Sequence, residues 1–215
     1  MQMKKIMIID DHPLVRIGFR LMIETEPGFS LCCEAASMDE ALTLIRRSSP
    51  DLAVVDLSLP DGSGLDLIKR MLAKIPELLI LVYSMHDEDL FAERVLQAGA
   101  KGYINKQEGG EQVMTAIKQI LDGKIYLSPE MTRHLMLKSS GDLAESALTP
   151  VEQLSNREME VFELIGHGAT TSEIASRLNL SVKTIESHRA NIKSKLGLRS
   201  SGELVRNAVQ WTLTA

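Results

Sequence analysis

Three carboxylates stand at the ends of two apolar runs and could together bind a divalent cation. Asp10 and Asp11 follow residues 6–9, and Asp56 follows residues 53–55. Apolar runs of this length predict buried strands of a parallel sheet, and ligands of such sheets gather at the carboxyl ends of the strands. We therefore expect the three carboxylates at one sheet edge, where their hard oxygen atoms suit Mg2+.

A cation at that edge would gather a phosphoryl group, which Asp56 could then attack as a carboxylate nucleophile. The backbone carbonyl of Ser58 and waters would complete the ligand set. Lys106, just past the fifth apolar run, would place a positive charge on the phosphoryl oxygens, and Ser84, past the fourth, offers a hydroxyl group. A single Asp at a strand end is more commonly a turn former or helix N-cap. The joint placement of these residues favours the chemical interpretation.

Alternating strand and helix patterns must position these residues. Strand-like runs lie near 4–9, 30–35, 52–56, 79–83 and 102–104. Between them, apolar residues recur at helical spacing, as in Val15, Phe19, Met22 and Ile23, in Leu65, Ile68 and Leu72, and in Val113, Ile117 and Leu121. The alternation predicts an α/β fold, a flavodoxin-like (βα)5 doubly wound parallel sheet of order 2-1-3-4-5, spanning residues 1–127. In that order strands one and three are neighbours.

A second, smaller all-α domain is predicted at residues 153–215, after a linker at 128–152. The linker begins with a short helix, for which Ser128 is the N-cap and Pro129 the first residue. Helix starts in the second domain are predicted at Ser155, with Glu158 completing a capping box, at Thr171 or Ser172, at Ser181 and at Ser200 or Ser201. The middle two of these four helices, joined by a tight turn, match helix-turn-helix geometry.

The charge of the chain is unevenly distributed. The net charge is −5 over 215 residues, yet residues 182–199 hold five cations and one anion, Glu186. A local basic surplus in an acidic protein predicts a phosphate-backbone partner for that segment. A merely solvated basic face is the alternative.

The basic segment has two faces as a helix. Val182, Ile185, Ile192 and Leu196 fall on a predicted core face, and Lys183, Ser187, Ala190 and Ser194 lie opposite, with Glu186 and Asn191 at the flanks. Small and polar residues on the outer face suit a helix that enters the major groove. Lys183, Lys193 and Lys195 would hold phosphates, and Arg189 and His188 lie nearer the core boundary.

Composition excludes several classes of protein. An apolar fraction of 44% supports a packed core and argues against disorder. The longest apolar runs fall far short of the ~18–20 residues of a membrane span, and the N-terminus lacks the features of a signal peptide. Cys32 and Cys33 are adjacent, which argues against an ordinary disulfide and fits packing within a strand. We expect a reduced, cytoplasmic protein without a membrane partner.

Residues 1–125 resemble the receiver domain of two-component response regulators. The resemblance rests on residues 8–13, 51–64 and 98–106 and on Ser84. It implies that Asp56 is the phosphoacceptor, that Asp11 ligates Mg2+ directly and Asp10 through water, and that Ser84 and Tyr103 form a switch pair. Tyr103 would turn inward when Ser84 moves toward the phosphoryl group. Ser58 and His86, each two residues past a pocket residue, are expected to tune the lifetime of the phosphoryl group.

Residues 154–168, 173–178 and 181–197 resemble a LuxR-type helix-turn-helix, and the whole chain resembles the NarL/FixJ family of response regulators. The resemblance implies that Thr184 and Lys195 help to fix the DNA backbone and that Glu186, Ser187 and Ala190 face bases. None of these three can make the bidentate Arg–guanine contact, so specificity would rest partly on Lys183, on Asn191 or on DNA shape. The expected DNA-binding set is Lys183, Thr184, Glu186, Ser187, His188, Arg189, Ala190, Asn191, Lys193 and Lys195.

These features predict a phosphorylation-activated transcription regulator rather than an enzyme. Its expected partners are a sensor histidine kinase, double-stranded promoter DNA, a second copy of the chain on activation, and RNA polymerase. In the resting form the receiver would cover the recognition helix or the dimer face. In the last helix, Leu204, Val205, Ala208 and Val209 are either a dimer contact or bundle core.

Two rival functions remain open from the residues alone. One is a phosphorylation-independent regulator that senses a ligand or a partner, against which the intact acid set argues. The other is an Mg2+-dependent phosphohydrolase, which is disfavoured because Ser58 stands where a second carboxylate, two residues after Asp56, would act as acid/base.

Overall fold

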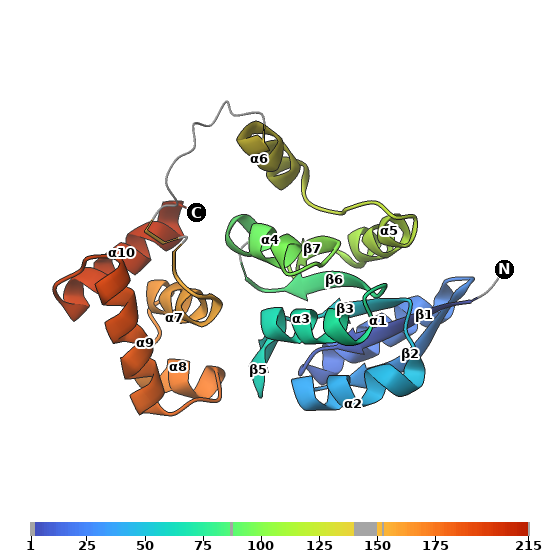
Figure 1. The fold of residues 1–215 in the computed structure, drawn as a ribbon, viewed down its shortest axis with the longest axis horizontal. Coiled ribbons are helices and arrows are strands. Elements are labelled where there is room, and N and C mark those ends of the chain that lie inside the picture. The colour runs from blue at the N-terminus through green and yellow to red at the C-terminus, as the bar shows by residue number, and fades with distance from the viewer. Residues whose placement is uncertain (1–2, 87, 140–149, 152, 215) are drawn as a thin grey trace. The chain divides into compact units, whose positions relative to one another are not determined.

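A computed structural model describes residues 3–86, 88–139, 150–151 and 153–214 (Figure 1). The chain forms two compact units, Met1–Met136 and Leu137–Ala215. Most of the predicted linker after Ser139 lies outside the described residues. Within the described ranges, no helix combines the length and apolarity needed to cross a bilayer.

The first unit contains a five-stranded parallel sheet, which confirms the predicted fold. Its strands are β1 (Lys4–Ile9), β2 (Phe29–Ala35), β3 (Leu52–Val55), β6 (Leu79–Ser84) and β7 (Gly102–Asn105), in the order β2-β1-β3-β6-β7. This is the predicted 2-1-3-4-5 order, because β4 and β5 belong to a separate hairpin. Ile9 pairs with Val55, so β1 and β3 end side by side.

Five helices cover the two faces of this sheet: α1 (Pro13–Thr25), α2 (Met38–Ser48), α3 (Gly64–Lys74), α4 (Glu88–Gln97) and α5 (Gly110–Leu121) (Figure 1). On one face, Phe19 and Ile23 of α1 and Ile117 of α5 pack with Ile8 and Val54 of the strands. Strand side chains alternate between faces, and both faces of the central strands are buried. This explains the continuous apolar runs in the sequence.

A short hairpin of two two-residue strands, β4 (Ser58–Leu59) and β5 (Gly62–Ser63), follows β3 and leads into α3. Its turn residue Asp61 accepts hydrogen bonds from the backbone amides of Met38 and Asp39 at 2.7 and 2.9 Å. A Cβ atom at Gly64 would lie 2.4 Å from the backbone oxygen of Asp56. Only glycine therefore allows α3 to begin directly against the loop that carries Asp56.

Helix α6 (Pro129–Ser139) lies where the sequence predicts the short helix. The hydroxyl of Ser128 caps it by accepting a hydrogen bond from the Met131 amide at 3.0 Å. The amide of Ser128 itself donates to Glu88 Oε1 at 2.9 Å. The start of α6 is thus tied to the first residue of α4.

The second unit is a bundle of four helices: α7 (Asn156–Gly166), α8 (Thr171–Arg177), α9 (Val182–Lys195) and α10 (Ser201–Thr214). Ser155 and Glu158 form the predicted capping box. A second capping box, made by Thr170 and Glu173, was not predicted. In the turn between α8 and α9, Asn179 has a φ of 49°, and Ser181 caps α9 as expected.

Two expectations about apolar residues in this unit are resolved by burial. Val182 does not belong to the core, since it is 48% exposed, whereas Ile185 and Ile192 are fully buried. Val182 is the first residue of α9, where the helix has not yet reached the bundle. In α10, Leu204 and Ala208 are fully buried and form bundle core.

Candidate functional site

The predicted carboxylates meet at one edge of the sheet. Side-chain ligand atoms of Asp10, Asp11, His12 and Asp56 all lie within 4.8 Å of one another. Asp10 and Asp56 are each 2% exposed, while the side chain of Asp11 is 38% exposed. The site is therefore a buried acidic floor with one solvent-facing carboxylate at its mouth.

Lys106 joins the two buried carboxylates. Its Nζ atom lies 2.7 Å from Asp10 Oδ2 and 2.7 Å from Asp56 Oδ2, and its side chain is 8% exposed. The Lys106 amide donates to the carbonyl of Ser84 at 2.8 Å, which fixes the residue at the end of β7. One ammonium group thus neutralises part of a three-carboxylate cluster.

Burial and charge act in opposite directions on these groups. Burial raises the pKa of Asp56, and the negative charge of Asp10 raises it further, against the lowering effect of Lys106. Burial opposes the charge on Lys106, but the attraction of Asp56 and Asp10 outweighs it and raises the pKa of Lys106. An additional positive charge would therefore be favourable at this site.

The oxygen atoms available fit a hard divalent cation. Asp10 Oδ2 and Asp11 Oδ1 are buried atoms that receive no well-directed hydrogen bond from the described part of the chain. Among the described residues, each has only an ion-pair neighbour, Lys106 for Asp10 and His12 Nδ1, at 2.6 Å, for Asp11. An octahedral, oxygen-ligated ion such as Mg2+ would satisfy buried carboxylate oxygens that lack a well-directed hydrogen-bond donor.

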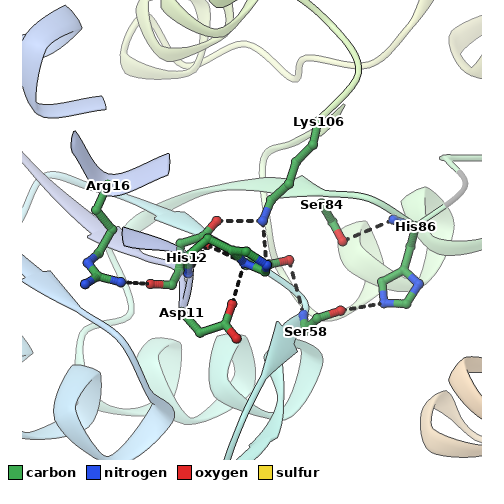
Figure 2. A network of polar contacts seen from close by, with 9 residues as sticks. Asp11, His12, Arg16, Ser58, Ser84, His86 and Lys106 are labelled. Atoms are coloured by element: carbon green, nitrogen blue, oxygen red, sulfur yellow. Dashed lines mark hydrogen bonds and ion pairs between the residues drawn. The ribbon is translucent and has the colours of Figure 1, made fainter. Parts of the chain in front are cut away.

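A second group of polar contacts lies beside the acidic floor and centres on His86 (Figure 2). Its Nε2 atom is 3.0 Å from Ser58 Oγ, its ring stacks on Phe91, and its amide donates to Ser84 Oγ at 3.3 Å. The Tyr103 hydroxyl donates to the carbonyl of His86 at 2.5 Å. The two residues expected to tune the lifetime, Ser58 and His86, are in direct contact.

Tyr103 and Ser84 are both inside the protein. Tyr103 is 1% exposed and Ser84 is fully buried. The expected switch pair is thus joined through one residue, because the amide of His86 contacts Ser84 and its carbonyl contacts Tyr103. The inward orientation of the Tyr103 ring, expected only after phosphorylation, is already present.

Sequence reasoning missed three residues that shape the site. His12 Nδ1 contacts both Asp10 and Asp11 (Figure 2). Arg16 Nη1 donates to the carbonyl of Asp10 at 2.6 Å, and Asn105 Nδ2 donates to the carbonyl of His86 at 3.1 Å. The position of His12 directly after the acidic pair was a usable signal. The other two contacts involve backbone carbonyls, which leave no pattern in the sequence.

Helix α9 presents most of the expected DNA-binding residues at its surface. Exposed side chains are those of Lys183, Glu186, Ser187, Ala190 and Asn191, and the partly buried ones are those of Thr184, His188, Arg189 and Lys193. Burial lowers the pKa of His188, and the positive charge of Arg157 lowers it further.

Lys195 differs from the other cations of α9 because it has a partner within the bundle. Its Nζ atom lies 2.6 Å from Oε2 of Glu158, the capping-box residue of α7, whose side chain is 6% exposed. The pKa of Glu158 is lowered because hydrogen bonds from Lys195 and Ser155 outweigh its burial. Lys195 thus ties the end of α9 to the start of α7.

Family models and relatives cover both units. The model of the response regulator receiver domain matches residues 6–118, and that of bacterial regulatory proteins of the luxR family matches residues 152–208. The oxygen regulatory protein NreC of Staphylococcus carnosus is 37% identical over 210 residues, which are 96% of this chain and 97% of NreC. NreC of Staphylococcus aureus is likewise 37% identical, with the same coverage.

Solved structures of RcsB from Salmonella are similar over nearly the whole chain. One, RcsB bound to the promoter rprA in the presence of the phosphomimetic BeF3-, is 27% identical with a TM-score of 0.65 and covers 95% of this chain and 98% of its own. Another RcsB structure has a TM-score of 0.69 at 27% identity and covers 98% of each chain.

Replacing Lys106 with Met should destabilise the first unit most strongly at neutral pH. The change leaves two buried carboxylates without their ammonium partner, and we expect a loss of about 2–3 kcal/mol in the free energy of unfolding. Because the folded-state pKa of Asp56 is raised above 3.8, the folded protein takes up its proton at higher pH than the unfolded chain. Stability therefore increases as the pH falls through that window, and the deficit of Lys106→Met should shrink there.

Urea unfolding over a pH series, without divalent cations, measures this effect. Lys101→Met is the matched control, since Lys101 is exposed on the same unit. A deficit for Lys106→Met that is independent of pH, or no larger than that of the control, would contradict the electrostatic account.

Proposed function

Because the chain belongs to the response regulators that join a receiver domain to a LuxR-type DNA-binding domain, we propose that Asp56 is the residue on which phosphorylation acts. The chain is a phosphorylation-activated, DNA-binding transcription regulator of a two-component system, and its family is not one of enzymes. The observation that carries the assignment is the position of Asp56, buried at the end of β3 and 2.7 Å from Lys106 Nζ. The proposed receiver spans residues 1–127, the linker 128–152 and the DNA-binding domain 153–215.

In this proposal an oxygen of Asp56 attacks the phosphorus atom of a phosphohistidine on the partner kinase, and the histidine leaves. Asp11, Asp56 and the carbonyl of Ser58 would ligate Mg2+ directly and Asp10 through water; when bound, the ion neutralises charge on the phosphoryl oxygens. Lys106 would exchange its contact with the Asp56 carboxylate for one with a phosphoryl oxygen. Its fixed backbone position at the end of β7 supports this role.

Ser84 would carry the signal away from Asp56. Its hydroxyl accepts from the His86 amide at 3.3 Å, a contact that must be lost if the hydroxyl turns toward a phosphoryl oxygen. Release of His86 would loosen the segment that leads to Glu88. Since Glu88 accepts a hydrogen bond from the Ser128 amide, the movement would reach α6 and through it the rest of the linker.

The kinase would dock on α1, beside the mouth of the acidic site. Leu14, Ile17 and Leu21 follow one another at helical spacing and are 82%, 46% and 60% exposed. An exposed apolar stripe of this kind is typical of a helix that binds a partner. Asp11, the solvent-facing carboxylate, lies just before the same helix.

The remaining proposed partners act through the second unit. Promoter DNA would be bound by α9, with Lys183 and Lys193 on phosphates and the exposed residues Glu186, Ser187, Ala190 and Asn191 near bases. The set also includes Thr184, His188 and Arg189 at the edges of the helix. Two activated copies would bind paired half-sites, with Val205, 40% exposed on α10, at the dimer contact.

RNA polymerase is the proposed downstream partner. The cytoplasm is the proposed location because promoter DNA and the kinase's phosphohistidine must both be reached there.

Beryllofluoride with Mg2+ should increase the affinity of the chain for a selected promoter sequence. Coupling free energies of 1–3 kcal/mol between sites predict a change of about tenfold. DNA selection followed by titration, run beside Asp56→Ala, measures it. Equal binding in every condition would contradict the switch and favour a phosphorylation-independent regulator, and a lack of sequence-selective binding would contradict the regulator function.

The contact between Ser58 and His86 should lengthen the life of the phosphoryl group by closing one approach of water. His86→Ala should shorten the half-life about fivefold, since one hydrogen bond contributes about 1 kcal/mol. Loss of acid-labile phosphate over time measures the half-life. Ser58→Ala should have a similar effect and add little in the double variant. A longer half-life in His86→Ala would mean that the imidazole instead assists the attacking water.

Two lysines of α9 should behave differently when each is replaced by Ala. Lys183→Ala removes an exposed charge, so DNA binding should weaken, and the slope of the logarithm of the binding constant against the logarithm of salt concentration should fall by about one. The free energy of unfolding should stay unchanged. Lys195→Ala breaks the pair with Glu158 and should lower the free energy of unfolding by about 1 kcal/mol. Thermal unfolding and salt titrations of DNA binding compare them. Equal stabilities of the two variants would show that the Glu158 pair is of no structural importance.

A further inference from the structure

Cys32 and Cys33 are adjacent residues of one strand, and their sulfur atoms are closer together than a regular strand would place them. The two Sγ atoms are 3.8 Å apart on β2, an edge strand of the sheet. In a regular strand adjacent side chains point to opposite faces. Here the pairing of β2 with β1 is irregular: Ile6 pairs with Leu31 and Met7 with Cys33, which leaves Cys32 as an extra residue in a bulge. The bulge interrupts the alternation and allows the thiols to approach.

The surroundings give the two thiols different properties. Cys33 Sγ lies 3.0 Å from the Ser48 hydroxyl, and Cys32 Sγ lies 3.3 Å from the carbonyl of Ile6. Hydrogen bonding from Cys32 lowers the pKa of Cys33 to about 7 against the effects of burial and of Glu34. The same contact raises the pKa of Cys32. Both residues are partly exposed.

We propose that this pair is a reversible oxidation site for peroxides, in which Cys33 reacts first and Cys32 resolves the product. The Cys33 thiolate attacks one peroxide oxygen, the O–O bond breaks, and Cys33 becomes a sulfenic acid. The Cys32 sulfur then attacks the sulfur of Cys33, and the hydroxyl leaves with the Cys32 proton as water. Two thiols and one hydrogen peroxide thus give one disulfide and two waters. A nucleophilic, accessible thiol beside a resolving thiol is the arrangement of redox-sensitive cysteines.

The disulfide formed would be strained and therefore easily reduced. Adjacent Cα atoms are about 3.8 Å apart, below the usual separation of about 4.4–6.8 Å across a disulfide. Strained disulfides have less negative reduction potentials and are the labile ones. The oxidised state would accordingly be transient in the presence of cellular thiols.

A structural route also connects this strand to the acidic site, and its importance rests on the proposed function. Glu34, next to Cys33, lies 3.7 Å from Arg16 Nε, and Arg16 Nη1 donates to the carbonyl of Asp10. The carbonyl of Ala35 accepts from the Asp10 amide at 3.1 Å. A strained ring at the bulge would shift the residues that position Asp10.

Peroxide treatment of the full chain, followed by thiol labelling and peptide mass spectrometry, tests the proposal. At neutral pH, Cys33 should react about tenfold faster than in the urea-unfolded chain, because far more of it is thiolate. The wild type should lose both thiols together and recover both with dithiothreitol. Cys32→Ser should accumulate a sulfenic acid on Cys33 that dimedone traps, and Cys33→Ser should keep its remaining thiol.

Ser48→Ala provides a milder variant, which keeps both thiols and removes the hydroxyl that accepts from the Cys33 thiol, so Cys33 should react at least as fast as in the wild type. Reaction of Cys33 no faster than in the unfolded chain, or disulfides only between chains, would overturn the proposal. These readouts need no phosphorylation, so they fail or succeed independently of the role of Asp56. An oxidised protein that responds to beryllofluoride as the reduced one does would overturn the route to Asp10.

Discussion

The sharing of one ammonium group by two buried carboxylates is the interaction on which the receiver depends. The parallel register that pairs Ile9 with Val55 forces Asp10 and Asp56 together, and Lys106 lies 2.7 Å from both. With Asp11 at the mouth, the cluster holds more negative than positive charge. Such a site is costly by itself, and a divalent cation would relieve the excess negative charge. In the proposed mechanism a phosphoryl group on Asp56 would redistribute these charges, which would make the site a switch rather than a fixed ion pair.

In the proposed mechanism the contacts around His86 would convert that change of charge into a change of shape. Ser84 and Tyr103 hold the backbone of His86 from two sides, and Ser58 holds its ring. A hydroxyl that turns toward Asp56 removes one of these supports. Glu88, two residues on, anchors Ser128 at the start of α6. His86 and Glu88 thus contact, respectively, the residues beside Asp56 and the start of α6, the helix with which the linker begins.

Much of this arrangement could be predicted from the sequence because it follows from local rules. The alternation of apolar runs with helical patterns predicted the strand order, and the ends of the runs predicted the positions of the carboxylates and of Lys106. The spacing of Ser155 and Glu158 predicted the capping box. The β4–β5 hairpin was not predictable, since two-residue strands have no periodicity. Contacts between residues far apart in the chain, such as Lys195 with Glu158, leave no local signal. The exposure of Val182 depends on where the bundle ends along α9, and the helical periodicity of the sequence does not carry this information. The bulge at Cys32 is likewise a property of strand pairing.

The central claim is that Asp56 carries the phosphoryl group, and locating that group tests it most directly. The chain would be incubated with acetyl phosphate, quenched in acid and digested, and the modified residue identified by mass spectrometry after borohydride reduction. We predict a single phosphoryl group on Asp56 that requires Mg2+ and disappears in Asp56→Ala. A phosphoryl group on another residue, or none on Asp56 when Mg2+ is present, would contradict the account.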